Sequence, residues 1–190
     1  MIRKVNGSQK FENWKQIKSK IFENLEDWKK TYIDEWLAHF ERFGDINWKI
    51  YQRPQNHTPV AGAGIDLSTS RLMLISSAGA YQPEMQQPFD APNPLGDYGI
   101  RVFSPDTPFI NLAYAHDHYD QKAVKKDPQV LLPLAHLREM VIDGKIGTLT
   151  KVVSFMGYQP DVSRVIDETI LAILGIAEKE KIDAALLVPA

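Results

Sequence analysis

The strongest chemical signal in the sequence is a run of polar residues, His116-Asp117-His118-Tyr119-Asp120. If this run is extended, its side chains alternate between two faces, so that His116, His118 and Asp120 project together. Two imidazoles and a carboxylate on one face can bind a metal ion or act as a general acid and base. Alternatively, these residues have a purely structural role and hold the loop backbone by hydrogen bonds.

A metal-dependent hydrolase is one interpretation of the His116, His118 and Asp120 cluster. Metallo-β-lactamase-like enzymes carry a His-x-His-x-Asp-His signature, but Gln121 stands here where the last histidine is required. The remaining downstream histidine, His136, falls in a predicted helix. We therefore predict no metal site and assign the three side chains a supporting acid–base or site-lining role. The hydrolase is kept as an alternative, as is a non-enzymatic binding module.

Gly157 and Tyr158 form a second candidate group, because they follow a predicted strand at its carboxyl end. Parallel sheets bind ligands at this edge, where a glycine lets backbone approach closely and a tyrosine can donate a hydrogen bond. We assign both to substrate binding, together with Asp117 and Tyr119 on the opposite face of the extended run. The expected ligand is a small molecule.

Strand-like and helix-like segments alternate in the second half of the chain. The expected strands are 71–76, 110–115, 152–156 and 184–190, and the expected helices are 133–143 and 162–181. Such alternation favours right-handed crossover helices and a mostly parallel sheet, so the predicted fold class is α/β. The last run is apolar without interruption, which predicts a strand covered on both faces.

A proline-rich stretch interrupts this pattern. Six of the twelve prolines lie between Pro83 and Pro108. Proline lacks an N–H and has a fixed φ, so Pro92 and Pro94 exclude a helix or a central strand around them. A long irregular segment of this kind either covers a functional site or wraps the surface without chemistry, and the sequence leaves both possibilities open.

The N-terminal region is rich in aromatic residues. Eight of the nineteen lie in the first 45 positions, and large apolar residues recur every three or four positions from 11 to 43 without Pro or Gly. This pattern predicts one long helix or two shorter ones that end at Gly44. We therefore expect a helical extension at 1–45 and an α/β domain at 46–190. The extension covers the core or pairs with its copy in a homo-oligomer, or else it docks a partner or a membrane surface; mixed charges on its polar face favour the first two.

Composition excludes several classes of protein. The chain has 190 residues, no cysteine and a net charge of −2. The absence of cysteine excludes a thiolate nucleophile or a cysteine-rich zinc site within these residues. The small net charge disfavours nucleic acid and anionic bilayers as partners. We expect no secretory signal, since no apolar run follows Arg3 and Lys4, and the apolar stretch 170–177 is too short to span a membrane. We expect a cytoplasmic protein that binds neither nucleic acid nor membrane.

Several sequence blocks recur in the order of a known family. They are His116-Asp-His-Tyr-Asp120, Val130-Leu-Leu-Pro-Leu-Ala-His-Leu-Arg-Glu139, Asp143-Gly-Lys-Ile-Gly147, Ser154-Phe-Met-Gly-Tyr158 and residues 183–190, with Gln87-Pro-Phe-Asp90 and Ser104-Pro-Asp-Thr-Pro108 upstream. Through these blocks, residues 109–190 and more loosely 71–108 resemble the selenoprotein B family of glycine, sarcosine, betaine and D-proline reductases, in particular its short stand-alone members.

The resemblance implies a thiol- or selenol-dependent oxidoreductase that reductively cleaves a small amine or amino-acid-like substrate. It places the redox residue, selenocysteine or cysteine, directly after the final strand, with a second cysteine a few residues on. We therefore expect a longer selenoprotein in which a UGA codon after Ala190 was taken as a stop, with a true end of the chain as the alternative. No cofactor is expected in these residues. A thiol reductant or reductase partner is expected. The large members of the family also depend on a pyruvoyl group of another polypeptide, of which this sequence shows no sign.

Overall fold

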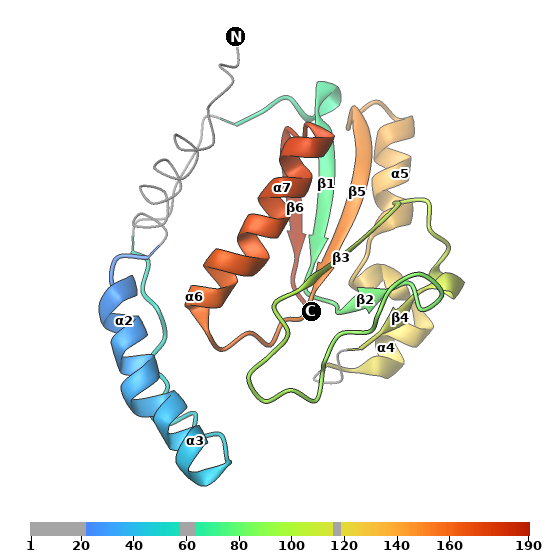
Figure 1. The fold of residues 1–190 in the computed structure, drawn as a ribbon. Helices are drawn as coiled ribbons and strands as arrows, with labels where there is room; N and C mark the ends of the chain where they lie inside the picture. The colour runs from blue at the N-terminus through green and yellow to red at the C-terminus, as the bar shows by residue number, and fades with distance from the viewer. Residues whose placement is uncertain (1–21, 58–63, 116–118) are drawn as a thin grey trace. The chain divides into compact units, whose positions relative to one another are not determined.

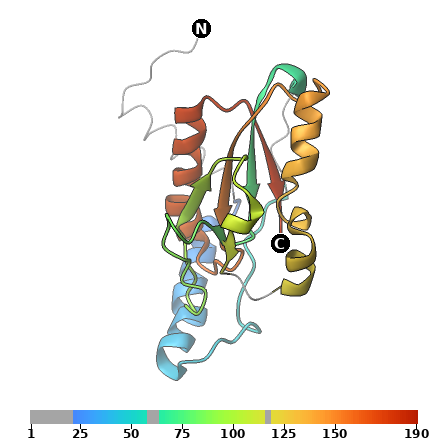
Figure 2. The same cartoon turned by 90° about the vertical axis from the view of Figure 1, so that its right-hand side faces the viewer.

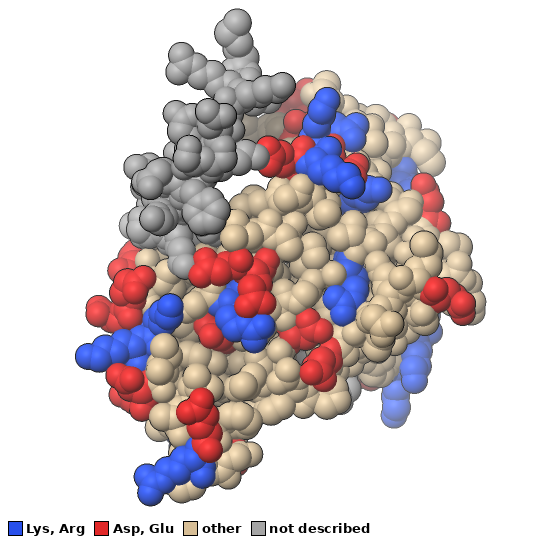
Figure 3. Space-filling view, in the orientation of Figure 1, with Lys and Arg blue, Asp and Glu red and all other residues tan. Residues whose placement is uncertain are grey.

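The computed structural model describes residues 22–57, 64–115 and 119–190. It divides into two compact units, Met1–Gly62 and Ala63–Ala190. Within the described ranges, no helix is long and apolar enough to cross a bilayer. On the face shown in Figure 3, acidic and basic side chains are interspersed, so this face carries no broad field of one sign.

A continuous helix dominates the described part of the first unit (Figure 1). It consists of α2 (Leu25–Thr31), the π-helical segment η1 (Tyr32–Leu37) and α3 (Ala38–Phe43). Gly44 ends it with a φ of 71°, and its N–H donates to the carbonyl of Phe40. A left-handed glycine is a common helix stop. The predicted helix and its end are thus confirmed for residues 25–43, whereas the expected part at 11–21 lies outside the described residues.

Aromatic rings form the core of this unit. Trp28, Tyr32 and Trp36 stack along one side of the helix, with successive ring centroids 5.0 and 5.3 Å apart. The chain then returns along the helix, and the ring of Tyr51 meets all three rings edge-on. The indole N–H of Trp28 donates to the carbonyl of Gln52 at 2.7 Å. Trp28 and Trp36 are buried, so this part of the predicted aromatic stripe faces a core.

A four-stranded sheet forms the centre of the second unit. Its strands, in spatial order, are β3 (Ile100–Phe103), β5 (Thr148–Phe155), β1 (Arg71–Ser76) and β6 (Ala184–Val188). β1 pairs in parallel with both β5 and β6, and β3 pairs antiparallel with β5. The predicted α/β class with a mostly parallel sheet is confirmed.

Helices cover both faces of this sheet (Figure 2). On one face lie α4 (Gln121–Lys126) and α5 (Leu134–Ile142), and on the other lie α6 (Val162–Arg164), the π-helical segment η5 (Val165–Ile170) and α7 (Leu171–Glu180). Leu72 and Leu74 of β1 pack in one cluster with residues of α4 and α5, whereas Met73 and Ile75 pack with residues of α7. Successive side chains of β1 thus enter opposite layers, as expected for a central strand.

Three short turns and a small strand pair complete the second unit. They are the 3₁₀ turns η2 (Leu67–Thr69), η3 (Phe109–Asn111) and η4 (Pro128–Val130), and the antiparallel pair β2 (Ala80–Tyr81) and β4 (Ala113–Tyr114). The predicted strand at 110–115 was therefore wrong over most of its length. The N–H of Asn111 donates to the carbonyl of Pro108 at 2.9 Å, which closes a turn in place of an extended segment. The short strand that remains, β4, lies outside the four-stranded sheet.

β6 lies at the edge of the sheet and three of its five residues are exposed, so the prediction that it is covered on both faces was wrong. Among the described residues, no strand pairs with its outer side. Leu187 is 68% exposed. Apolar composition is typical of central strands, but the run itself does not determine whether a further strand lies beside it.

The proline-rich segment contains no helix or strand between Gln82 and Gly99, as predicted. Side chains hold it instead. The guanidinium of Arg101, in β3, donates to the carbonyls of Gln87 and Pro88 at 2.8 and 3.0 Å and lies 4.2 Å from the ring centroid of Phe89. β3 itself was not predicted, because it is short and follows this irregular segment directly.

Candidate functional site

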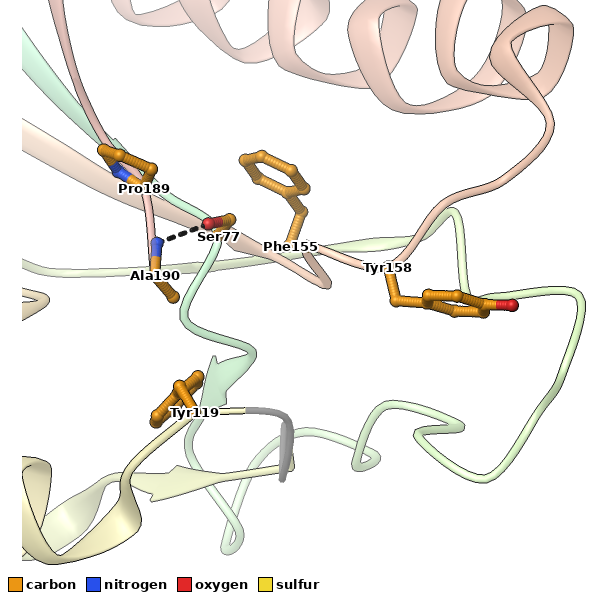
Figure 4. A pocket seen from close by; sticks show the side chains of 7 residues that line it. Ser77, Tyr119, Phe155, Tyr158, Pro189 and Ala190 are labelled. Carbon is orange, nitrogen blue, oxygen red and sulfur yellow. Dashed lines mark hydrogen bonds between the residues drawn. The ribbon is translucent and has the colours of Figure 1, made fainter. Parts of the chain in front are cut away.

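An open pocket of about 540 Å³ lies at the carboxyl edge of the parallel strands (Figure 4). Its lining residues are Ser77, Tyr119, Phe155, Gly157, Tyr158, Pro189 and Ala190. Ser77 follows β1, Phe155 ends β5 and Pro189 follows β6. Three parallel strands therefore end at this pocket, and this edge is where open α/β sheets bind ligands.

Tyr119, Gly157 and Tyr158 line the pocket together, and all three were predicted as substrate-binding residues. The hydroxyl of Tyr119 donates to the carbonyl of Ala78, and that of Tyr158 donates to the carbonyl of Pro94, each at 2.8 Å. These bonds fix both rings against backbone. The lining residues include no Asp, Glu, Lys, Arg or His, so the described walls consist of rings, small side chains and backbone.

Asp120 does not line the pocket. Its carboxylate accepts the backbone N–H of Lys122 at 2.8 Å and thereby caps the N-terminus of α4. This contact does not favour a role as a metal ligand. Among the described residues, no group of three or more His, Cys, Asp or Glu side chains is placed to hold a metal ion. His116, Asp117 and His118 lie outside the described residues, and their roles stay predictions.

Two fully buried serines build the edge of the sheet beneath the pocket, and neither was predicted. The hydroxyl of Ser76 donates to the carbonyl of Leu131 at 3.0 Å and accepts the N–H of Ala78 at 3.3 Å. The hydroxyl of Ser154 accepts the N–H of Ala80 at 2.7 Å. The available signal was a serine at the carboxyl end of each apolar strand, where loop backbone needs hydrogen-bond partners.

The loop between β1 and β2 ties the pocket together. The N–H of Ser77 donates to the carbonyl of Val188 at 3.3 Å, and its hydroxyl accepts the N–H of Ala190 at 2.8 Å. Two residues later, the N–H of Gly79 donates to the carbonyl of Phe155 at 2.9 Å. Gly79 has a φ of 62°, which glycine adopts without strain. One loop thus fixes the ends of β5 and β6 relative to β1.

Burial changes the acidity of three tyrosines at this edge. Burial raises the pKa of Tyr119 well above its usual value, and the neighbouring Tyr114 raises it further. Burial also raises the pKa of Tyr158, and it raises that of Tyr114 to about 12. All three phenols are therefore neutral near pH 7, and Tyr119 and Tyr158 act as hydrogen-bond donors.

Alkaline pH is expected to destabilise the second unit through Tyr114. Burial raises the pKa of this phenol from 10.0 to about 12, so its contribution to stability is present below pH 10 and is lost as the pH rises towards 12. The Tyr114→Phe variant keeps the ring but cannot ionise, so its melting temperature should fall less steeply across this range. Calorimetry at several pH values measures both slopes. Parallel curves for the two proteins would contradict this assignment.

Gly96 allows the proline-rich segment to approach Tyr158. Its φ is 81°, and a Cβ built on it would lie 2.7 Å from the carbonyl oxygen of Tyr158 and 3.1 Å from Cδ of Pro160. We expect Gly96→Ala to lower the free energy of unfolding by about 2–4 kcal/mol, because left-handed strain adds to overpacking. Gly144 is the matched control, since its φ is 70° but a Cβ there meets open space.

Gly144→Ala should therefore cost only the conformational term, about 1–2 kcal/mol. Urea unfolding followed by circular dichroism measures both variants. Equal losses would show that the close approach to Tyr158 has no energetic consequence.

Comparison with known proteins gives one distant relationship. The chain is 28% identical over 135 residues to the D-proline reductase subunit gamma of Acetoanaerobium sticklandii, a match that covers 70% of this chain and 53% of that protein. The chain thus spans about half the length of this curated relative. No family model and no solved structure matches the chain. This similarity relates the chain distantly to a subunit of a reductase.

Proposed function

We propose that this chain is the substrate-side part of a thiol- or selenol-dependent reductase of the selenoprotein B type. The reaction is the reductive cleavage of a carbon–nitrogen bond in a small amine or amino-acid-like substrate. The similarity to a D-proline reductase subunit supports the general class. The substrate of that relative is not carried over, because the match covers only 53% of its length.

The observation that carries the proposal is the composition of the carboxyl-edge pocket. Pro189 and Ala190, at the tip of β6, lie at the same pocket as Tyr119, Gly157 and Tyr158. These residues come from three separate blocks of the family resemblance. A selenocysteine or cysteine directly after Ala190, as the resemblance implies, would enter a site that already holds the two other blocks.

The proposed chemistry consists of two displacements. A selenolate or thiolate attacks the carbon that bears the amine; the carbon–chalcogen bond forms, and the amine leaves with the bonding electron pair and takes up a proton. A second thiol then attacks the chalcogen, and the carbon recovers an electron pair and a proton. The substrate gains two electrons and two protons, and the protein is left with a chalcogen–sulfur bond that an external dithiol reduces.

The pocket matches this chemistry in part. Its volume of about 540 Å³ admits an amino-acid-sized molecule, and its aromatic rings offer apolar contact to one side of such a molecule. The described lining offers no cation for a substrate carboxylate. We assign acid–base and anion recognition to His116 and His118, which precede Tyr119 in the chain, and to a partner subunit.

The natural gene product tests this proposal. Antibodies against the 190-residue chain are used to purify the protein and its partners from the source organism, and the intact protein is analysed by mass spectrometry. We expect selenium or a cysteine sulfur directly after Ala190. The purified complex, supplied with dithiothreitol, should release amine from a small amino-acid substrate.

Alkylation with iodoacetamide should abolish this release, and substrate added before the alkylating agent should slow the inactivation. A reading frame that ends after codon 190 with an ordinary terminator, and a natural product without either element, would overturn the proposal. An alkylation-resistant activity would overturn the assignment of the nucleophile.

A further inference from the structure

Ser77 holds the end of β6 by two hydrogen bonds. Its N–H donates to the carbonyl of Val188, and its hydroxyl oxygen accepts the N–H of Ala190 at 2.8 Å (Figure 4). The residue is 9% exposed and lines the pocket. The residue is therefore largely shielded from solvent at the point where the chain leaves the sheet.

The hydrogen of this hydroxyl has no acceptor among the described residues. A serine hydroxyl carries one donor hydrogen and can accept through its oxygen at the same time. The contact with Ala190 uses the oxygen as an acceptor, so the hydrogen remains free to rotate towards the pocket. Buried donors in folded proteins almost always have a partner, which indicates that the pocket supplies one.

The other hydroxyls of the pocket are already engaged as donors. That of Tyr119 donates to the carbonyl of Ala78, and that of Tyr158 donates to the carbonyl of Pro94. These two tyrosines are the titratable side chains of the described lining, and burial raises the pKa of each, so both are neutral near pH 7. The described walls therefore place no charged side chain beside Ser77.

We propose that Ser77 donates its hydroxyl hydrogen to an anionic sulfur or selenium atom at the tip of β6 and thereby stabilises the reactive ionised form. This role rests on the proposed reductase function, because that function supplies the anion. A donor lowers the pKa of a thiol or selenol by binding only its charged form well. The same hydroxyl oxygen holds the Ala190 N–H, so a single side chain both directs the chain end and stabilises the anion there.

A reporter thiol tests this role without any turnover. A single cysteine added directly after Ala190 places a thiol at the position of the proposed redox residue, next to the residue that Ser77 binds, in a protein that otherwise has no cysteine. The chain is produced with a short uncharged C-terminal extension, so that no terminal carboxylate lies beside the reporter. The rate of alkylation by iodoacetamide, measured as a function of pH, gives the pKa of the thiol.

We expect Ser77→Ala to raise the midpoint of this profile by about one pH unit, so that alkylation near pH 7 slows about tenfold. Ser77→Thr retains a hydroxyl and should keep the midpoint low, whereas its isostere Ser77→Val should raise it. The Thr and Val pair is decisive on its own if Ser77→Ala does not fold.

The Ala185→Cys reporter is the matched control, because Ala185 is an exposed residue of β6 that does not line the pocket. The pH midpoint of its alkylation profile should be the same with Ser77 and with the Ser77→Ala substitution. Unchanged midpoints for the cysteine after Ala190, or equal shifts for both reporters, would overturn the role of Ser77. The two proposals fail separately, since the absence of selenium or cysteine after Ala190 in the natural protein overturns the reductase function, whatever the reporter shows.

Discussion

Replacing Trp36 with alanine is expected to unfold the first unit. The side chain is 1% exposed, and its ring lies within 5.3 to 6.5 Å of four other aromatic rings, measured between centroids. Removing a buried tryptophan costs about 3–5 kcal/mol through lost burial and the cavity that remains. The unit is small and its core consists mainly of these rings, so a loss of this size is comparable to its whole stability.

Tryptophan fluorescence measures this effect selectively. All four tryptophans lie between residues 14 and 48, so the signal reports the first unit alone. Trp36→Phe is the matched control, because it keeps an aromatic ring, and the indole N–H that it loses has no partner among the described residues. We expect a red-shifted emission spectrum and no cooperative unfolding transition for Trp36→Ala. Trp36→Phe should still unfold in a cooperative transition. Cooperative unfolding of Trp36→Ala within about 1 kcal/mol of the wild type would contradict this account.

The elements that the sequence predicted correctly have strong local patterns. β1 coincides with its predicted bounds at 71–76, since a short apolar run lies between small polar residues on both sides. The helices at 134–142 and 162–180 agree with their predicted ranges within a residue or so, because apolar spacing and a terminal glycine or capping aspartate define them locally. In these segments local propensity and tertiary packing favour the same structure.

The elements that were missed or wrong depend on neighbours that a local pattern does not contain. β6 has the composition of a central strand but lies at the edge, because strand order is set by crossover connections. The predicted strand at 110–115 yields to a turn that begins at Pro108 and leaves Ile110 91% exposed. β3 forms because β5 offers it an edge to pair with, although its own sequence is not distinctive.

In the candidate site, too, residues with a local sequence pattern were predicted, and residues that depend on distant contacts were not. Tyr119, Gly157 and Tyr158 were predicted because they follow strands or belong to the polar run, and the structure brings them to one pocket. Asp120, from the same run, instead caps α4. Ser77 gives no signal by its type or spacing. Its importance arises from contact with Ala190, which is 113 positions away in the chain.

Ser76→Ala is expected to be the most damaging change of a single hydroxyl. Ser76 is fully buried, and its hydroxyl is bonded to the carbonyl of Leu131 and to the N–H of Ala78. Alanine leaves both backbone groups without this partner in a site that water does not reach. Each unsatisfied group costs about 1–3 kcal/mol, so we expect a loss of about 2–4 kcal/mol in the free energy of unfolding.

Two further serines make the test of Ser76 specific. Ser154 is equally buried but bonds only one backbone group, the N–H of Ala80, so Ser154→Ala should cost about half as much. Ser68 is exposed, and the free energy of unfolding of Ser68→Ala should lie within about 0.5 kcal/mol of that of the wild type.

Guanidinium unfolding ranks the three variants by stability. The rate of amide hydrogen exchange at Ala78 should rise in Ser76→Ala, because the acceptor of this N–H is gone. Since the carbonyl of Ala78 also accepts the hydroxyl of Tyr119, the same change should loosen the pocket wall. Equal losses for Ser76→Ala and Ser154→Ala, with unaltered exchange at Ala78, would show that the loop is held by packing and not by these hydroxyls.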